Sequence, residues 1–318
     1  MNDVNPSENI TADELKAYNS FGLDLIRSIQ PRTSDVLPRT LWHYTSGDTF
    51  IRIIESGALW STQIACLNDH TEFGYAINLL RSAIRDLRTR LSDNEAIRLC
   101  ELLDERLGTA DTHSTGYFVA CMSAEDDDLS QWRAYGGGEG GFAIGLDPAP
   151  LFKASAEGQG FLVQVLYDLS HQNSLIARIA EATVRFYCEG LRRRPGVDRE
   201  KWLTCFLTTW EVVVSPFAVM LKHPKFSGEK EWRFVRTLQA EDVNNLQFLQ
   251  RRTLMSRHLP LRFPSEREPG LLPITHVKVG PCRYKQISRI SAGDLLLKKG
   301  YDVDGILFEE SEAPFQIT

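Results

Sequence analysis

The sequence has no long apolar run and no apolar segment near its start. A membrane-spanning helix needs roughly 18 consecutive apolar residues, and the longest apolar stretch here, 212–221, is interrupted by Ser215 and Pro216. Residues 1–14 are polar and acidic, which excludes the pattern of a secretory signal. These absences predict a soluble, cytoplasmic protein with no membrane partner.

The cysteines are not clustered. The six lie at positions 66, 100, 121, 188, 205 and 282, and no two form a Cys-x-x-Cys pair. Zinc sites need clustered thiolates or imidazoles. We therefore expect reduced, mostly buried thiols and no metal site.

Positive charge is not in excess either. The formal net charge is −6 and the pI is close to 5.7, which argues against a broadly basic nucleic-acid-binding surface. Two local basic clusters remain, at 192–194 and at Arg251–Arg252. Solvated helix ends explain them as well as a local nucleic-acid contact does.

The apolar residues follow helical spacing in some segments and form short, dense runs in others. Helices are expected at about 12–30, 46–56, 73–87, 93–107, 172–192, 198–222 and 285–298, with a short helix or turn at 129–135. Strands are expected at 41–44, 58–62, 117–122, 141–146, 161–167, 231–238, 259–263, 274–279 and 305–308. Helices inserted among many strands predict an α+β fold with a mixed or antiparallel sheet. We expect an N-terminal helical extension over 1–35 and a single α+β domain over 36–318, with helical insertions at about 70–107 and 170–223.

The first candidate site is the segment 41–46, Leu-Trp-His-Tyr-Thr-Ser. A strand that ends in His43 and continues into Thr45 and Ser46 before a helix places an imidazole and two hydroxyls at one rim of a sheet. Such groups can hold the hydroxyls of a sugar. A core histidine bonded to a backbone carbonyl explains the same residues.

The second candidate is the turn 67–72, at the start of a helix. Asn68 or Asp69 can cap that helix and Glu72 can complete a capping box, or the turn can line a site. A metal site formed by Asp69, His70 and Glu72 is disfavoured, because consecutive residues rarely converge on one ion.

The third candidate combines Trp132 and Tyr135 with the glycine-rich bend 136–141. Glycines allow a sharp turn or a close approach of the backbone to a ligand. Their spacing matches neither the dinucleotide fingerprint GxGxxG nor a P-loop. The two aromatic residues, one helical turn apart, are either core residues or a stacking wall.

The fourth candidate is the strand that begins at Glu231. Alternation places Glu231 and Arg233 on one face and Trp232 and Phe234 on the other, which goes to the core. The charged face then lies in solvent or in a cleft. A glutamate next to an arginine stays ionised and suits the stabilisation of a positively charged sugar ring.

Together these four blocks resemble the bacterial domain of unknown function 2971, over about residues 40–315. The resemblance rests on His43-Tyr44, on 68–72 as Asn-Asp-x-x-Glu, on 132–135 as Trp-x-x-Tyr, and on 229–233 as Glu-x-Glu-x-Arg, with 279–281 fitting the end. His70 departs from the family pattern, which usually has proline after Asn-Asp.

The first block is also similar to that of ADP-ribosyltransferases. His43-Tyr44-Thr45, a helix closing at Gly57, and a second strand with Ser61 match the strand-end His-x-Thr/Ser block that contacts NAD in those enzymes. The resemblance implies that fold, NAD as substrate, and His43 and Glu231 as catalytic residues. It implies a binding set of His43, Tyr44, Thr45, Ser61, Asn68, Trp132, Tyr135 and Arg233. Trp60, Trp132 and Tyr135 compete for the stacking position.

Three hypotheses of different kinds follow. One is an NAD-dependent ADP-ribosyltransferase or NAD glycohydrolase, of the kind found in toxins and phage-defence effectors, with a protein or nucleic acid as acceptor. A second is a non-enzymatic sensor or interaction module on the same scaffold, using the helices at 172–222 as its interface. A nucleic-acid-processing protein with a metal near His70 or His223 is a third. The sequence identifies neither the acceptor nor the oligomeric state.

Overall fold

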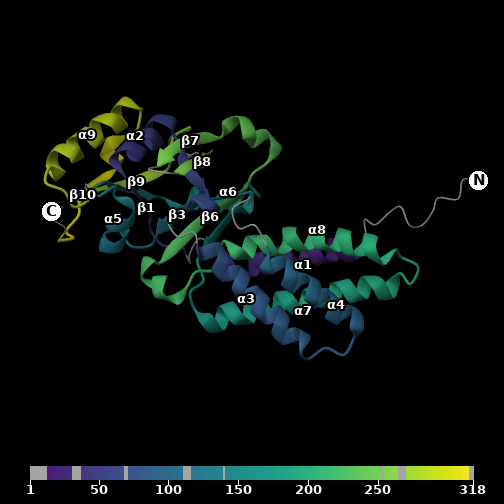
Figure 1. The fold of residues 1–318 in the computed structure, drawn as a ribbon. Coiled ribbons are helices and arrows are strands. Elements are labelled where there is room, and N and C mark those ends of the chain that lie inside the picture. The colour runs from purple at the N-terminus through teal and green to yellow at the C-terminus, as the bar shows by residue number, and fades with distance from the viewer. Residues whose placement is uncertain are drawn as a thin grey trace, which may run out of the picture. The chain divides into compact units, whose positions relative to one another are not determined.

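The structure of this protein is a computed structural model (Figure 1). It describes residues 13–30, 37–67, 71–109, 116–138, 140–251, 254–263 and 270–314. The chain forms two compact units. One is helical and takes its residues from Met1–Ile29, Thr71–Ser114 and Leu166–Pro224, and the other contains the sheet and takes Gln30–His70, Thr115–Val165 and Lys225–Thr318.

The helical unit packs its long helices around aromatic residues. Its helices are α1 (Asp13–Ile29), α3 (Thr71–Arg88), α4 (Asn94–Gly108), α7 (Leu169–Arg193) and α8 (Arg199–Ala218). Tyr18 of α1 is fully buried, with its ring centroid 5.3 Å from that of Phe186 on α7 and 5.3 Å from that of Phe206 on α8. The Tyr18 hydroxyl shares a 2.8 Å hydrogen bond with Thr183. The N-terminal helix is therefore part of this unit's core.

A buried ion pair joins two distant segments of the helical unit. Nζ of Lys222 lies 2.8 Å from a carboxylate oxygen of Glu72 at the start of α3, and both side chains are at most 5% exposed. The Gln172 amide donates to the carbonyl oxygens of Leu166 and Lys222. The capping box expected for Glu72 depends on residues 68–70, which lie outside the described residues, whereas the Lys222 contact is a partnership that sequence spacing does not reveal.

The other unit is built on one mixed sheet. Its strands are β1 (Leu41–Thr45), β2 (Leu59–Gln63), β3 (Tyr117–Ser123), β4 (Phe142–Leu146), β5 (Phe161–Gln164), β6 (Glu231–Thr237), β7 (Gln247–Arg251), β8 (Leu254–Leu261), β9 (Ile274–Val279) and β10 (Leu307–Glu310). The strand order is β10-β9-β4-β1-β3-β2-β8-β7, with β6 paired to β3 and β5 to β6. β9 and β10 are parallel and the other named pairs are antiparallel. The predicted α+β class with a mixed sheet is confirmed.

Short helices complete this unit. They are α2 (Gly47–Ser56), α5 (Leu129–Tyr135), α6 (Pro148–Ala156) and α9 (Lys285–Lys298), with 3-10 turns η2 (Ile64–Cys66), η3 (Pro224–Glu229), η4 (Ala240–Asn245) and η5 (Val303–Gly305). Side chains of α2, α6 and α9 join the main core, which also contains Leu41 of β1. The neighbouring residues Trp42 and Tyr44 instead pack with Trp132 of α5 in a second cluster. Alternation along β1 thus sends successive side chains into two different clusters.

One strand and the end of one helix differ from the sequence predictions. β7, which lies at the edge of the sheet, was not predicted from the sequence, because Gln247, Gln250 and Arg251 are polar. The helix expected over 198–222 ends at Ala218, two residues after Pro216. Among the described helices, none has the length and apolar character needed to cross a membrane.

Candidate functional site

The candidate site lies where the sheet divides. One edge of β3 is shared by two strands, since β1 is registered with it at Trp42–Ser123 and β2 at Thr62–Val119 and Gln63–Phe118. β1 and β2 therefore part from each other along the middle of β3. Backbone groups at such a division have no regular ladder on that side and need other partners.

His43 supplies one of these partners. Its Nδ1 lies 2.8 Å from the carbonyl oxygen of Cys121, in the middle of β3. A carbonyl oxygen can only accept, so Nδ1 carries a proton and donates it. The bond fixes both the tautomer and the orientation of the imidazole. His43 was expected either to bond a backbone carbonyl or to lie at the rim of a site. The structure shows both, because His43 bonds Cys121 and also lines the cavity described next.

A cavity of about 750 Å³ opens at the division. Its described lining comes from β1, β2, β3, α5, the glycine-rich bend and the β7–β8 hairpin. The polar and aromatic lining residues include His43, Tyr44, Thr45, Ser46, Thr49, Trp60, Thr62, Arg133, Tyr135 and His258. The volume falls in the range of about 300–1,000 Å³ typical of small-molecule sites.

The charge of the lining has one sign. Arg133, on the exposed side of α5, is the permanently charged residue among the described residues that line the cavity, and no described carboxylate lines it. The hydroxyl-bearing residues Thr45, at the end of β1, and Ser46 and Thr49, at the start of α2, also line the cavity. A cationic side chain and several hydroxyls favour an anionic, hydroxylated ligand.

The helix beside His43 forms as predicted. Ser46 caps α2 by accepting from the backbone N–H of Thr49, and Gly57 ends it in the left-handed conformation with φ of 59°. Phe50, Ile53 and Ile54 are buried. These local signals hold the end of β1 and the start of α2 at the rim of the cavity.

The glycine-rich bend brings α5 against the end of β1. Gly141 has φ of 85°, and a Cβ there would lie 2.4 Å from the Thr45 carbonyl oxygen. Gly137 and Gly138, both with positive φ, line the cavity. Of the two roles expected for the bend, the tight connection is present, and the same connection places backbone beside the cavity.

Tyr44 and Trp132 support the site from behind. Their rings meet edge to face, with centroids 4.7 Å apart. The Tyr44 hydroxyl donates to the Glu125 carbonyl oxygen at 2.8 Å and accepts from the Asp128 N–H at 3.1 Å. Burial raises the pKa of Tyr44 far above its ordinary value, and the nearby aspartates add to the effect, so the hydroxyl stays protonated. Trp132 is 2% exposed and does not line the cavity.

Glu231 and Arg233 form a buried, bidentate ion pair on β6. Nε and Nη2 of Arg233 lie 2.8 and 3.0 Å from the two carboxylate oxygens of Glu231. Glu231 is 4% exposed and Arg233 is completely buried. Their face of the strand is opposite to that of Trp232 and Phe234, which are in the main core as predicted.

A small void is lined by both Glu231 and the histidine. It measures about 40 Å³, and its other lining residues are Trp42, Met122, Gln131 and Glu229, together with Tyr44, Cys121 and Tyr135, which like His43 also line the main cavity. The structure therefore brings the two residues predicted to be catalytic, His43 and Glu231, to the same void, with Tyr135 beside them.

The remaining predicted residues separate into three groups. Thr45 lines the main cavity. Ser61 is fully buried and donates to the Leu259 carbonyl oxygen at 2.6 Å, which makes it a link between β2 and β8. Asn68, with Asp69 and His70, lies outside the described residues. Of the three aromatic candidates, Trp60 and Tyr135 line the cavity.

His258 was not expected at the site. It is 1% exposed, lines the cavity, and has its ring nitrogens 3.2 Å from Thr62 Oγ1 and 2.7 Å from Ser256 Oγ. Its ring is 5.8 Å from that of Trp60. A histidine between Ser256 and a proline on a strand gives no motif, so only the pairing of β8 with β2 reveals it.

The described residues contain no group of three or more histidine, cysteine, aspartate or glutamate side chains placed to hold a metal ion.

The two basic clusters of the sequence, at 192–194 and at Arg251–Arg252, are only partly within the described part of the chain. Arg193 and Arg194 are paired with the buried Glu14 of α1. The side chains of Arg251 and Arg252 lie outside the described part of the chain.

Fold and site together define an α+β protein with a polar cavity at a division of its sheet. Residues 131–234 match the family described as "Protein of unknown function (DUF2971)". The match confirms the predicted resemblance over residues 131–234, which include Trp132, Tyr135, Glu231 and Arg233, and the other motifs of the predicted range 40–315 lie outside it. Comparisons with curated proteins and with solved structures returned no match.

Proposed function

We propose that this protein binds NAD in the cavity between β1 and β2 and breaks its nicotinamide–ribose bond. The observation that carries the proposal is the small void lined by His43, Tyr135 and Glu231, since His43 and Tyr135 also line the 750 Å³ cavity. The similarity of the His43-Tyr44-Thr45 block to ADP-ribosyltransferases supports the same conclusion. Arg133 at the rim gives the cavity a charge suited to the NAD pyrophosphate.

The proposed roles follow from the chemistry of each group. His43, oriented by its bond to Cys121, and Thr45 hold the hydroxyls of the nicotinamide ribose. Tyr135 stacks on the nicotinamide ring. Glu231, paired with Arg233, stabilises the positive charge that develops on the ribose as the bond breaks.

The reaction is balanced without a redox partner. The bond between ribose C1′ and the nicotinamide nitrogen breaks, and its electron pair leaves with neutral nicotinamide. A nucleophile then adds to C1′ and loses its proton. With a protein or nucleic-acid nucleophile the product is ADP-ribosylated acceptor, and with water it is free ADP-ribose. A role as a toxin or phage-defence effector belongs to this proposal.

The test is nicotinamide release from NAD, measured by chromatography, with candidate protein and nucleic-acid acceptors added in separate reactions. We expect His43→Ala and Glu231→Gln each to reduce release by at least about a hundredfold, the effect of removing one charge-stabilising group. His171→Ala, at an exposed position of α7, is the histidine control. Glu72→Gln, which breaks the buried ion pair with Lys222, controls for the destabilisation caused by Glu231→Gln. Absence of both NAD binding and nicotinamide release in the wild type would sink the proposal.

A non-enzymatic ligand sensor is the second candidate. The observation that favours it is the burial of Glu231, which is 4% exposed and has both carboxylate oxygens bonded to Arg233. Calorimetry separates the two. The sensor predicts that NAD binds without nicotinamide release and that Glu231→Gln leaves the affinity unchanged, whereas the enzyme predicts that release depends on Glu231.

A further inference from the structure

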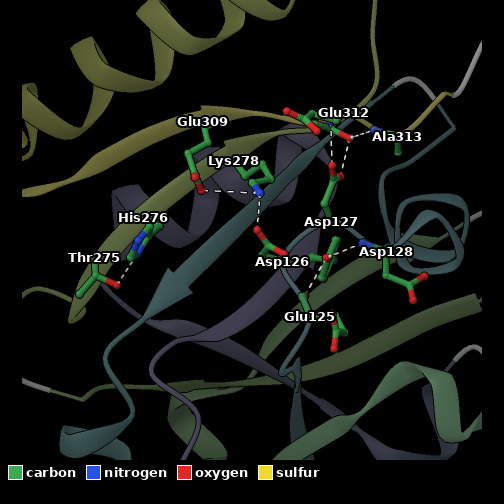
Figure 2. Close-up of polar contacts among 12 residues, drawn as sticks. Glu125, Asp126, Asp127, Asp128, Thr275, His276, Lys278, Glu309, Glu312 and Ala313 are labelled. Atoms are coloured by element: carbon green, nitrogen blue, oxygen red, sulfur yellow. Dashed lines mark hydrogen bonds and ion pairs between the residues drawn. The ribbon is translucent and has the colours of Figure 1, made fainter.

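The acidic segment 125–128 follows β3, and its three aspartates have different partners. Asp126 forms a 2.5 Å ion pair with Lys278 of β9, and Asp128 caps α5 through the N–H groups of Ser130 and Gln131. In Figure 2 the Asp126 carboxylate points to Lys278, while Asp127 points to Glu312. Asp127 therefore has a role that its neighbours do not share.

The Asp127 carboxylate joins α5 to the segment after β10. Oδ1 accepts from Nε1 of Trp132 at 2.7 Å and from Oγ of Ser311 at 2.5 Å, and Oδ2 accepts from the N–H of Glu312 at 2.7 Å. Partial burial acts to raise the pKa of Asp127, but these three bonds outweigh it and lower the pKa. The carboxylate form is thus the one that the surroundings stabilise.

Trp132 connects Asp127 to two parts of the cavity lining, namely Tyr44 of β1 and the residues of α5 itself. Its ring packs edge to face on Tyr44, the residue after His43 on β1. Its helix, α5, presents Arg133, Ala134 and Tyr135 to the cavity. Trp132 itself is in the buried cluster behind the cavity, so Asp127 acts on the site through it.

We infer that Asp127 is a positioning residue of the cavity. By holding the indole of Trp132, it fixes α5, and with it Tyr135, against β1. Ser311 and Glu312 in turn hold the Asp127 carboxylate by donating hydrogen bonds to it. The segment after β10 therefore helps to support the cavity. The link to NAD rests on the proposed function, whereas the anchoring of α5 does not.

The test follows hydrogen exchange of the α5 amides by mass spectrometry, with no ligand present. We expect Asp127→Asn to raise exchange over residues 129–135 at least tenfold and to leave α6 at its wild-type rate. Asp126→Asn, which removes the adjacent charge and the Lys278 ion pair, is the matched control and leaves exchange of α5 unchanged. Unchanged α5 exchange in Asp127→Asn, or an equal increase in α5 and α6, overturns the inference.

A double-mutant cycle shows whether Asp127 acts through Trp132. Trp132→Phe keeps a ring but removes the Nε1 donor. We expect the double variant Asp127→Asn/Trp132→Phe to exchange at α5 no faster than the more affected single variant, and independent, multiplied effects contradict the inference. The same cycle measured on the Kd for NAD shows a shared loss of about tenfold. If the wild type binds no NAD, the proposed function fails, and the exchange cycle still decides the role of Asp127.

Discussion

Nδ1 of His43 donates a 2.8 Å hydrogen bond to the carbonyl oxygen of Cys121, at the point where β1 and β2 part along β3. The bond satisfies a backbone group of the divided sheet and at the same time sets the ring beside the cavity. Support of the fold and orientation of the ring therefore both depend on Nδ1. The dependence of the fold on this bond and the dependence of the site on the imidazole can be tested separately.

We expect His43→Asn to keep the fold and to lose the site. The asparagine amide can replace the Nδ1–H donor, but it has no group at the position of Nε2. The free energy of unfolding should fall less in His43→Asn than in His43→Ala, which loses a hydrogen bond with a net value of about 1 kcal/mol. Urea unfolding measures the stability, and calorimetry with NAD measures the binding. Equal stability losses in the two variants would show that the Cys121 bond contributes nothing.

The second prediction concerns the backbone contact between the glycine bend and β1. Gly141 and Gly138 both have positive φ, at 85° and 80°, but a Cβ at Gly141 meets the Thr45 carbonyl oxygen, whereas a Cβ at Gly138 meets nothing within 4 Å. Gly138→Ala should cost about 1–2 kcal/mol for the left-handed backbone alone. Gly141→Ala should cost clearly more, because the clash adds to the same strain. Unfolding by urea compares the two, and equal losses contradict the close packing of the bend on Thr45.

Local features of the site could be predicted from the sequence because they depend on near neighbours. The cap at Ser46, the end of α2 at Gly57 and the core face of Trp232 and Phe234 each follow from residues within one turn or one strand. The family resemblance also rests on such short motifs.

Long-range features could not be predicted in this way. The bond from Ser311 to Asp127 spans 184 positions and that from Ser61 to Leu259 spans 198, so no sequence spacing indicates them. Leu23 of α1, which is apolar, is nevertheless 39% exposed. Gly22 takes the inner position instead, because α8 approaches so closely that a Cβ there would lie 2.8 Å from Val213. Packing partners decide such positions, and helical periodicity alone does not.

The third prediction concerns the thiols. All six cysteines are free, but only Cys100 and Cys188 are fully buried, fewer than the sequence led us to expect. Burial raises the pKa of each of these two thiols to about 11. Because the thiolate is the reactive form, a pKa two units above the ordinary value lowers its population near pH 8 by about a hundredfold. Peptide mapping after brief iodoacetamide treatment of the native protein should find Cys100 and Cys188 unmodified while Cys66 and Cys282, which are partly exposed, react. Equal labelling of all four contradicts the burial.

The last prediction is the pH dependence of stability due to Asp127. Its pKa is lowered in the folded protein, where the hydrogen bonds from Ser311, Trp132 and Glu312 outweigh the effect of burial. A group of this kind stabilises the fold above its unfolded pKa of about 4 and loses that contribution as the pH falls through its lower, folded pKa. The difference in free energy of unfolding between the wild type and Asp127→Asn should therefore be constant above about pH 5 and shrink below about pH 4. Urea unfolding across this range measures it, with Asp126→Asn as the control for removal of one negative charge. A gap that stays constant or widens toward low pH contradicts the assignment, because it would mean that the Asp127 carboxylate gains nothing from its three donors.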